Sequence, residues 1–215
     1  MPARFWNVRF RTCYGSRVPR PRTFDEDRAV DAAMRTFWAQ GYEATTTQDL
    51  CEATGLGRSS IYNTFTSKHG LFTRALLRYI ETTNAAQLAV LEDERRPPVE
   101  RLRALVALIV DGEEANRRDG RSLGCLTVNT TVELAGRDPE ATALLERDLQ
   151  RRIGLLREVI AAGQRDGGIT STRDPASLAR YLNAVIGGIR VAGQGGADRD
   201  VLQSIADTAL DALTP

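Results

Sequence analysis

Apolar residues recur at three- and four-residue spacing along almost the whole chain from Phe24 onward. The first such stripe contains Val30, Ala33 and Phe37, and a similar stripe near the C-terminus begins at Val201. This spacing places apolar side chains on one face of an α-helix. No segment alternates apolar and polar residues as a half-buried strand does, and no repeat or low-complexity tract is present. The sequence therefore predicts an all-α fold with about nine helices.

Capping residues and glycines indicate where these helices begin and end. Aspartate followed by proline occurs at Asp138 and at Asp174, a pair typical of an N-cap and a first helical turn. Gly41 and Gly55 are typical of helix ends. The predicted helices begin near residues 25, 46, 59, 68, 98, 123, 139, 175 and 198, and the fourth is followed as far as Ile80.

The composition is that of a globular protein with room for a sizeable core. The chain has 215 residues, of which 42% are apolar and 27% charged. Its longest apolar run, 104–110, has seven residues, whereas a membrane span needs about 20. No apolar segment follows the basic N-terminus, so the pattern does not indicate a secretory signal. We expect no membrane partner.

Cysteine and histidine usage narrows the chemistry further. Cys13, Cys51 and Cys125 are odd in number and far apart, which argues against a disulfide framework and for the reducing cytoplasm. His69 is the only histidine, so a histidine-based metal cluster is excluded. We expect neither a metal nor a cofactor.

Charge is distributed unevenly along the chain. Residues 1–80 contain 12 basic and 7 acidic residues, whereas residues 81–215 contain 17 basic and 21 acidic residues. Such a split is typical of a nucleic-acid-binding end joined to a different second half. Chance is the alternative explanation.

The first 22 residues contain six arginines, three prolines and no acidic residue. Proline breaks helices, so we expect a disordered tail without a role. A start codon at Val18 would remove most of it from the cellular protein. The alternative is a basic arm that enters a minor groove beside a docked domain.

Residues 46–65 are the most informative segment. Two short predicted helices flank the turn 55–57, as in a helix-turn-helix motif. In that motif the second helix lies in the major groove, and arginine and asparagine are suited to guanine and adenine. An ordinary helical hairpin with a polar surface is the alternative. The short polar residues of the second helix are Arg58, Ser59, Ser60, Asn63 and Thr64.

The region from Phe24 to about Ile80 resembles the TetR family of bacterial transcription regulators. The matching residues are Ala29, Ala33, Phe37, Gly41-Tyr42, Thr45-Thr46-Thr47, Leu50, Ala53, Gly55-Leu56-Gly57, Ser59-Ser60-Ile61-Tyr62, Phe65, Ser67-Lys68 and Leu71-Phe72. The resemblance implies a homodimer whose N-terminal heads bind a palindromic operator in double-stranded DNA. It also implies a C-terminal helical domain that forms the dimer and binds a small molecule, here an unknown effector.

The resemblance also assigns roles to single residues of the head. Thr46, Thr47, Tyr62 and Lys68 match positions that contact phosphate, and such contacts do not read sequence. The candidates for base reading are Arg58, Ser59, Ser60 and Asn63. Two departures affect the operator sequence: Asn63-Thr64 replace a frequent Tyr-His, and His69 replaces a frequent Glu. We interpret His69 as a cap or a phosphate neighbour.

Together these patterns predict three segments. They are a basic tail (1–22), a helix-turn-helix DNA-binding domain (23–70) and a helical ligand-binding and dimerisation domain (71–215). The resemblance implies a repressor that leaves its operator when a ligand moves the fourth helix and spreads the heads. Two alternatives are a constitutive regulator without an inducer and a transcriptional activator.

The segment 124–134 is the distinctive feature of the second half. On a helix, Cys125, Asn129, Val132 and Glu133 would share one face, and such a mixed wall suits a small-molecule pocket. The segment resembles a Gly-Cys-Leu…Asn…Glu stretch in a subset of the family, some members of which respond to electrophiles or oxidants. Cys125 as a reactive sensor is therefore an alternative, and a buried, inert thiol is another.

Several of these assignments have a structural alternative. Asn129 and Glu133 are equally suited to bonding backbone groups where helices cross. Four residues are candidates for the same cavity on helical facing alone, with core packing as the alternative: Leu105, Ile109, Leu156 and Tyr181.

The last two predicted helices, about 175–192 and 198–213, resemble the pair that forms the dimer interface in the family. Gly187-Gly188 would allow close backbone approach there. Packing within one chain is the alternative.

An enzyme is not expected in the helical half. A nucleophile pair of Cys125 or Ser122 with His69 would have to span two domains. The adjacent carboxylates Glu113-Glu114 are interpreted as a solvated helix face.

Overall fold

The computed structural model describes residues 24–118 and 123–214, and every regular element in these ranges is an α-helix. The all-α prediction and the number of helices are confirmed for these residues. The helices are α1 (Glu26–Gln40), α2 (Thr47–Thr54), α3 (Arg58–Phe65), α4 (Lys68–Leu91), α5 (Pro98–Arg118), α6 (Leu126–Leu134), α7 (Pro139–Asp166), α8 (Pro175–Gln194) and α9 (Arg199–Asp211).

Most helix starts lie where the sequence predicts them, because the capping side chains form the expected bonds. Each side-chain oxygen accepts a hydrogen bond from a backbone N–H of the first turn, which satisfies a group that would otherwise have no partner. The caps predicted at Asp138 and Asp174 are confirmed. The other capping side chains are Asp25, Thr46, Ser67 and Asp198.

Three boundaries differ from the prediction. α3 starts at Arg58 behind Gly57, without a side-chain cap, and α4 continues to Leu91 instead of ending near Ile80. α6 starts at Leu126 rather than at residue 123. The cause of the late start is Gly124, whose φ of 59° is left-handed and cannot continue a right-handed helix.

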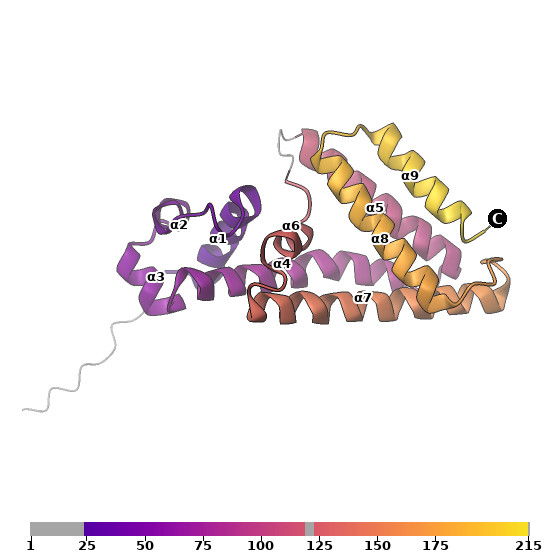
Figure 1. Ribbon diagram of the computed structural model, residues 1–215, viewed down its shortest axis with the longest axis horizontal. Coiled ribbons are helices and arrows are strands. Elements are labelled where there is room, and N and C mark those ends of the chain that lie inside the picture. The colour runs from indigo at the N-terminus through magenta and orange to yellow at the C-terminus, as the bar shows by residue number, and fades with distance from the viewer. Residues whose placement is uncertain (1–23, 119–122, 215) are drawn as a thin grey trace, which may run out of the picture.

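The helices form a head and a body joined by one long helix. The head consists of α1 to α3, and the body consists of α5 to α9. Figure 1 shows α4 running from the head into the body, with α7 alongside it and α8 and α9 at the C-terminal end. A displacement of α4 in the body would therefore be transmitted directly to the head.

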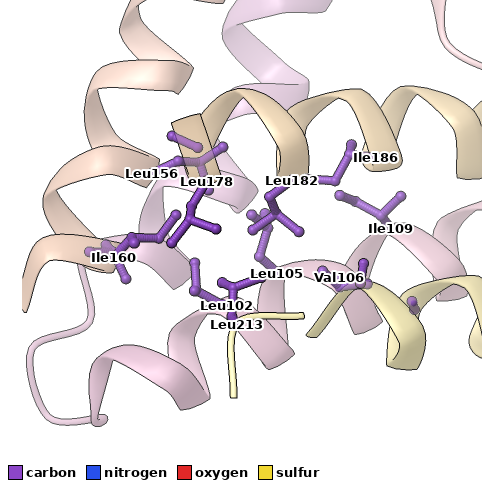
Figure 2. Close-up of a cluster of buried hydrophobic side chains, with 14 of the residues drawn as sticks. Leu102, Leu105, Val106, Ile109, Leu156, Ile160, Leu178, Leu182, Ile186 and Leu213 are labelled. Carbon is purple, nitrogen blue, oxygen red and sulfur yellow. The ribbon is translucent and has the colours of Figure 1, made fainter. Parts of the chain in front are cut away.

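The core of the body lies between α5, α7, α8 and α9. Figure 2 shows Leu105 from α5, Leu156 from α7 and Leu182 from α8 pointing into one cluster. Leu105 is 1% exposed and Leu156 is fully buried. Both side chains pack helix against helix, as in the core-packing alternative, and their assignment to a ligand cavity stays a prediction.

The core of the head continues into the body. Phe37 of α1 and Phe72 of α4 are buried edge to face, with ring centroids 5.1 Å apart. The same cluster contains Leu126 and Leu134 from α6 and Leu144 from α7. The predicted domain boundary at residue 70 divides the sequence, but side-chain packing crosses it.

Some predictions fall outside the described residues. They concern the tail 1–22, Cys13 and Ser122. Within the described ranges, no helix is long and apolar enough to cross a membrane, and no group of three or more His, Cys, Asp or Glu side chains is placed to hold a metal ion.

Candidate nucleic-acid interface

The turn between α2 and α3 exposes one face of α3. Gly55 closes α2 with a left-handed φ of 69°, a conformation that glycine adopts without steric cost. Ile61 is fully buried and Phe65 is 3% exposed, so these two side chains fix the rotation of α3 about its axis. The opposite face projects Arg58, Ser59, Tyr62 and Asn63 into solvent.

Tyr62 connects the starts of the two helices of this motif. Hydrogen bonds with Thr47 of α2 and then Arg58 of α3 lower the pKa of the Tyr62 phenol below its usual value. The Arg58 guanidinium also lies 5.8 Å from the centre of the Tyr62 ring. Two predicted phosphate contacts and one predicted base reader therefore meet at one exposed point.

The neighbouring threonines have different functions. Thr46 forms a capping box with Asp49: its Oγ1 accepts from the Asp49 N–H at 3.1 Å, while its own N–H donates to the Asp49 carboxylate at 2.7 Å. The Thr45 hydroxyl donates to the Gly41 carbonyl at 2.6 Å. Thr46 thus supports the start of α2, and Thr47 is the threonine that faces Tyr62.

Lys68 is placed at the positive end of α4, where the first helical turn already attracts anions. Its Nζ atom lies 3.4 Å from the Glu43 carbonyl and 4.4 Å from the centre of the Tyr42 ring. These contacts hold the ammonium beside the α1–α2 turn. Of the other predicted DNA contacts, Ser60 and Thr64 are half-buried.

Glu133 of α6 fixes that α1–α2 turn from the side of the body. Its two carboxylate oxygens accept hydrogen bonds from the backbone N–H of Tyr42 at 2.9 Å and of Glu43 at 2.7 Å. Gly41 has a φ of 82°, and a Cβ there would lie 3.1 Å from the Glu133 carboxylate. The alternative interpretation of Glu133, a bond to backbone where helices cross, is confirmed.

A second polar contact joins the start of α4, next to the head, to the start of α7. The His69 Nε2 atom lies 2.6 Å from Oδ2 of Asp138, and Nδ1 lies 3.6 Å from Glu140. Burial alone would raise the pKa of Asp138, but bonds from the Ala141 amide and the His69 ring outweigh it and lower the pKa. The interpretation of His69 as a helix cap or a phosphate neighbour is wrong, because its ring is turned toward α7.

Cys125 lies buried at the N-cap of α6. Its Sγ atom is 3.1 Å from the Thr127 hydroxyl and receives a 3.5 Å hydrogen bond from the Tyr79 hydroxyl. Burial alone would raise the pKa of the thiol, but the nearby Arg190 and these bonds lower it. The same burial, together with Cys125, raises the pKa of Tyr79.

The predicted polar wall of the 124–134 segment does not form. Val132 is 84% exposed, while Cys125 is buried and precedes the helix, so the two do not share a helical face. Asn129 donates to the Leu123 carbonyl at 3.0 Å and thereby stabilises the backbone before α6. Tyr181, predicted to face the same cavity, is 40% exposed on α8.

Val132 lines a cleft of about 350 Å³ between α6, α7 and α8. A second cleft, between α4, α5 and α8, was missed by the sequence prediction. It is lined by Ile109, the only one of the predicted ligand residues there, together with Tyr79, Gln87, Glu113 and Arg190. Glu113 was predicted to be solvated, but it is 4% exposed and paired with Arg190. The burial of Glu113 was predictable from the sequence, because residue 113 lies four positions after Ile109 and therefore on the same apolar face of the helix.

Two family models match the chain. The model for bacterial regulatory proteins of the tetR family matches residues 29–75, and the model for the tetracyclin repressor-like C-terminal domain matches residues 98–209. This chain belongs to the TetR family. The family predicted from the sequence is confirmed. That this chain belongs to the Gly-Cys-Leu…Asn…Glu subset of the family stays a prediction.

Curated relatives and solved structures agree with this family. ComR of Escherichia coli K12, a transcriptional repressor, is 35% identical over 193 residues, which cover 89% of this chain and 90% of ComR. YezE of Bacillus subtilis 168, an uncharacterised transcriptional regulator, is 32% identical over 199 residues, which cover 90% of this chain and 98% of YezE. A cysteine mutant of CifR in complex with 26-base-pair operator DNA is 30% identical, with a TM-score of 0.76 over 90% of this chain and 99% of that chain.

Proposed function

We propose that this TetR-family protein is a homodimeric repressor that binds a palindromic operator in double-stranded DNA and is released by a small-molecule effector. The observation that carries the DNA-binding part is the exposed face of α3, with Tyr62, Thr47 and Arg58 gathered at its start. The operator complex of the structural relative CifR supports the same assignment.

In this proposal α3 lies in the major groove, as the second helix of a helix-turn-helix motif does. Arg58, Ser59 and Asn63 are exposed and carry groups suited to base edges. Tyr62 and Lys68, with Thr47, hold the backbone phosphates. Residues 23–70 then serve DNA binding, and residues 71–215 serve dimerisation and effector binding.

Dimerisation is assigned to α8 and α9. The outer face of α8 presents Tyr181, Ala184, Gly188 and Val191 to solvent, with the exposed Arg180 at its edge. Added Cβ atoms at Gly187 and Gly188 would meet no atom within 4 Å, which leaves room for a second helix to approach closely. Val201 of α9 is 48% exposed on the adjoining helix. To bind successive half-sites, the two heads of such a dimer have to lie about 34 Å apart, one turn of DNA.

The effector response requires coupling between body and head. Three connections carry it in our proposal: the continuous helix α4, the Glu133 contact with the α1–α2 turn, and the contact of His69 with Asp138. An effector that favours a different placement of α6 or α4 would move the heads away from the operator spacing. Linkage then requires DNA to weaken effector binding by the same factor.

A second candidate function is sensing of oxidants or electrophiles through Cys125. The observation that favours it is the set of hydroxyls around the Cys125 Sγ atom, Thr127 at 3.1 Å and Tyr79 at 3.5 Å. With the nearby Arg190 they lower the pKa of the thiol, and thiolates are the reactive form. Cys125 is only 3% exposed, so the reagent would need an opening near α6. Loss of the response in Cys125→Ser, with DNA binding retained, would support this function, and an unchanged response would contradict it.

The DNA-binding proposal is tested by titrating the full-length protein against duplex DNA from upstream of its own gene at several salt concentrations. We expect specific binding that weakens with salt and is weaker in Tyr62→Phe. The control is Gln150→Ala, an exposed position on α7, which should bind DNA as the wild type does. A folded dimer that binds no duplex at any salt concentration would contradict the proposal.

A further inference from the structure

The cleft between α4, α5 and α8 contains deeply buried polar groups. Its volume is about 330 Å³, and it borders Gly124 in the segment before α6. Gln87 and Glu113 are 6% and 4% exposed, and the side chain of Arg190 is 11% exposed. Polar groups at this depth normally have their hydrogen bonds satisfied, so their partners need to be accounted for.

Arg190 makes one hydrogen bond with the side chain of a described residue. Its hydrogen bond to a described residue runs from Nη1 to Oε1 of Glu113 over 3.4 Å, although a guanidinium carries five N–H donors in a planar fork. The Gln87 amide makes a 3.5 Å bond to the Thr83 carbonyl of its own helix. Within the described residues, the Arg190 fork therefore has donors left for a further acceptor, and apolar side chains such as Ile109 lie beside it.

We infer that this cleft binds a small carboxylate with a flat apolar body, and that such a compound belongs to the effector class of this regulator. A carboxylate matches the guanidinium fork with two parallel hydrogen bonds. Trp38, packed edge to face on Tyr79 with centroids 5.0 Å apart, and Ile109 provide surfaces for the apolar body. This inference rests on the proposed effector response.

Glu113 competes with such a ligand for Arg190. α8 approaches α5 closely at this point because residue 193 is glycine: a Cβ there would lie 3.0 Å from the Cβ of Glu113. Burial raises the pKa of Glu113 against the opposing effect of Arg190. Glu113→Gln removes the competing charge while keeping the shape, so we expect it to tighten carboxylate binding by roughly tenfold.

Gly112 provides a way to fill the cleft without disturbing the fold. It lines the cleft on α5, and an added Cβ would meet no atom within 4 Å. Replacing a glycine inside a helix also improves helix propensity. Gly112→Leu should therefore fold normally and obstruct the cleft. Gly154→Leu on α7 is the matched control, since a Cβ there also meets nothing within 4 Å.

The probes are benzoate and its neutral isostere benzamide, titrated into the full-length protein. Trp38 lines the cleft, so its fluorescence reports occupancy once the other tryptophan, Trp6, is changed to Phe. We expect saturable quenching by benzoate, with benzamide at least roughly tenfold weaker because it lacks the charge. Binding should be lost in Arg190→Gln and Gly112→Leu, retained in Gly154→Leu and tightened in Glu113→Gln.

The inference is overturned if the folded wild type shows no saturable benzoate binding, if benzamide binds equally well, or if Arg190→Gln binds benzoate as the wild type does. In those cases Arg190 and Glu113 form a purely structural ion pair. Operator binding, measured on the same samples without probe, separates the two proposals. Duplex bound but benzoate not bound removes the effector class alone, whereas benzoate bound and duplex not bound removes the DNA-binding function.

Discussion

The carboxylate of Glu133 accepts a hydrogen bond from the backbone N–H of Tyr42, 2.9 Å away across the junction of body and head. Its second oxygen accepts from the N–H of Glu43. Both donors precede the Thr46 cap of α2, so the helix-turn-helix motif is held in place by a residue of the body. A carboxylate that accepts two N–H groups is a stronger tether than a neutral acceptor.

Glu133→Gln should loosen this tether. Glutamine has one acceptor oxygen, and its NH₂ group would face the second backbone N–H, so we expect a loss of about 1.5–3 kcal/mol in the free energy of unfolding. Urea unfolding measures it. Glu146→Gln, an exposed position on α7, is the control and should change stability little; equal losses in both variants would contradict the assigned tether.

Tyr62 and Asn63 should differ in how they affect DNA binding. Tyr62→Phe removes a phosphate contact and should weaken binding to all duplexes about equally, with the salt dependence unchanged because the phenol hydroxyl carries no charge. Asn63→Ala removes a base contact and should cost about 1–3 kcal/mol at one operator position. Binding to a set of single-base operator variants distinguishes the two. A uniform loss for Asn63→Ala would remove it from the base-reading residues.

Because of the His69–Asp138 contact, the free energy of unfolding should depend on pH. The pKa of Asp138 is lowered in the folded protein, so its contribution is complete above the unfolded value of about 3.9 and is lost as the pH falls through the folded pKa. Asp138→Asn keeps a capping side chain but lacks the charge. We expect it to be about 0.5–1 kcal/mol less stable near neutral pH and equal to the wild type in strong acid.

Unfolding measured across this pH range tests the effect. Asp211→Asn at the exposed end of α9 is the control and should show no comparable trend. A stability difference for Asp138→Asn that persists unchanged in strong acid would mean that shape, not charge, is responsible.

Leu156 should behave as a core residue and not as a ligand contact. It is fully buried between α5, α7 and α8, so Leu156→Ala should cost about 2–5 kcal/mol. Val132→Ala removes an 84% exposed side chain and should cost under about 0.5 kcal/mol. Thermal unfolding of both variants measures the difference. A small loss for Leu156→Ala would favour its assignment to a cavity.

The helices and the head were predictable because their signals are local. Asp25, Thr46 and Ser67 cap backbone groups within three residues of themselves, and the buried spacing of Ile61 and Phe65 orients α3. The α6 boundary was missed because Gly124 takes a left-handed φ, and nothing nearby in the sequence requires it.

The contacts of the body were less predictable because their partners are far apart in the chain. Glu133 binds backbone N–H groups about 90 residues away, and backbone has no sequence signature. Glu113 and Arg190 are 77 residues apart. The spacing of apolar residues in α5 indicates that Glu113 is buried. Only the packing of α8 against α5 shows that Arg190 lies beside it.

Protection of guanine N7 from methylation tests the central claim most directly, because N7 lies in the major groove. With the full-length protein bound to its operator, we expect two protected sets of guanines on one face of the duplex, about 34 Å apart. Both sets should disappear in Arg58→Ala at concentrations where the wild type is fully bound. Protection confined to the minor groove, or stable binding with every guanine N7 reactive, would contradict the account.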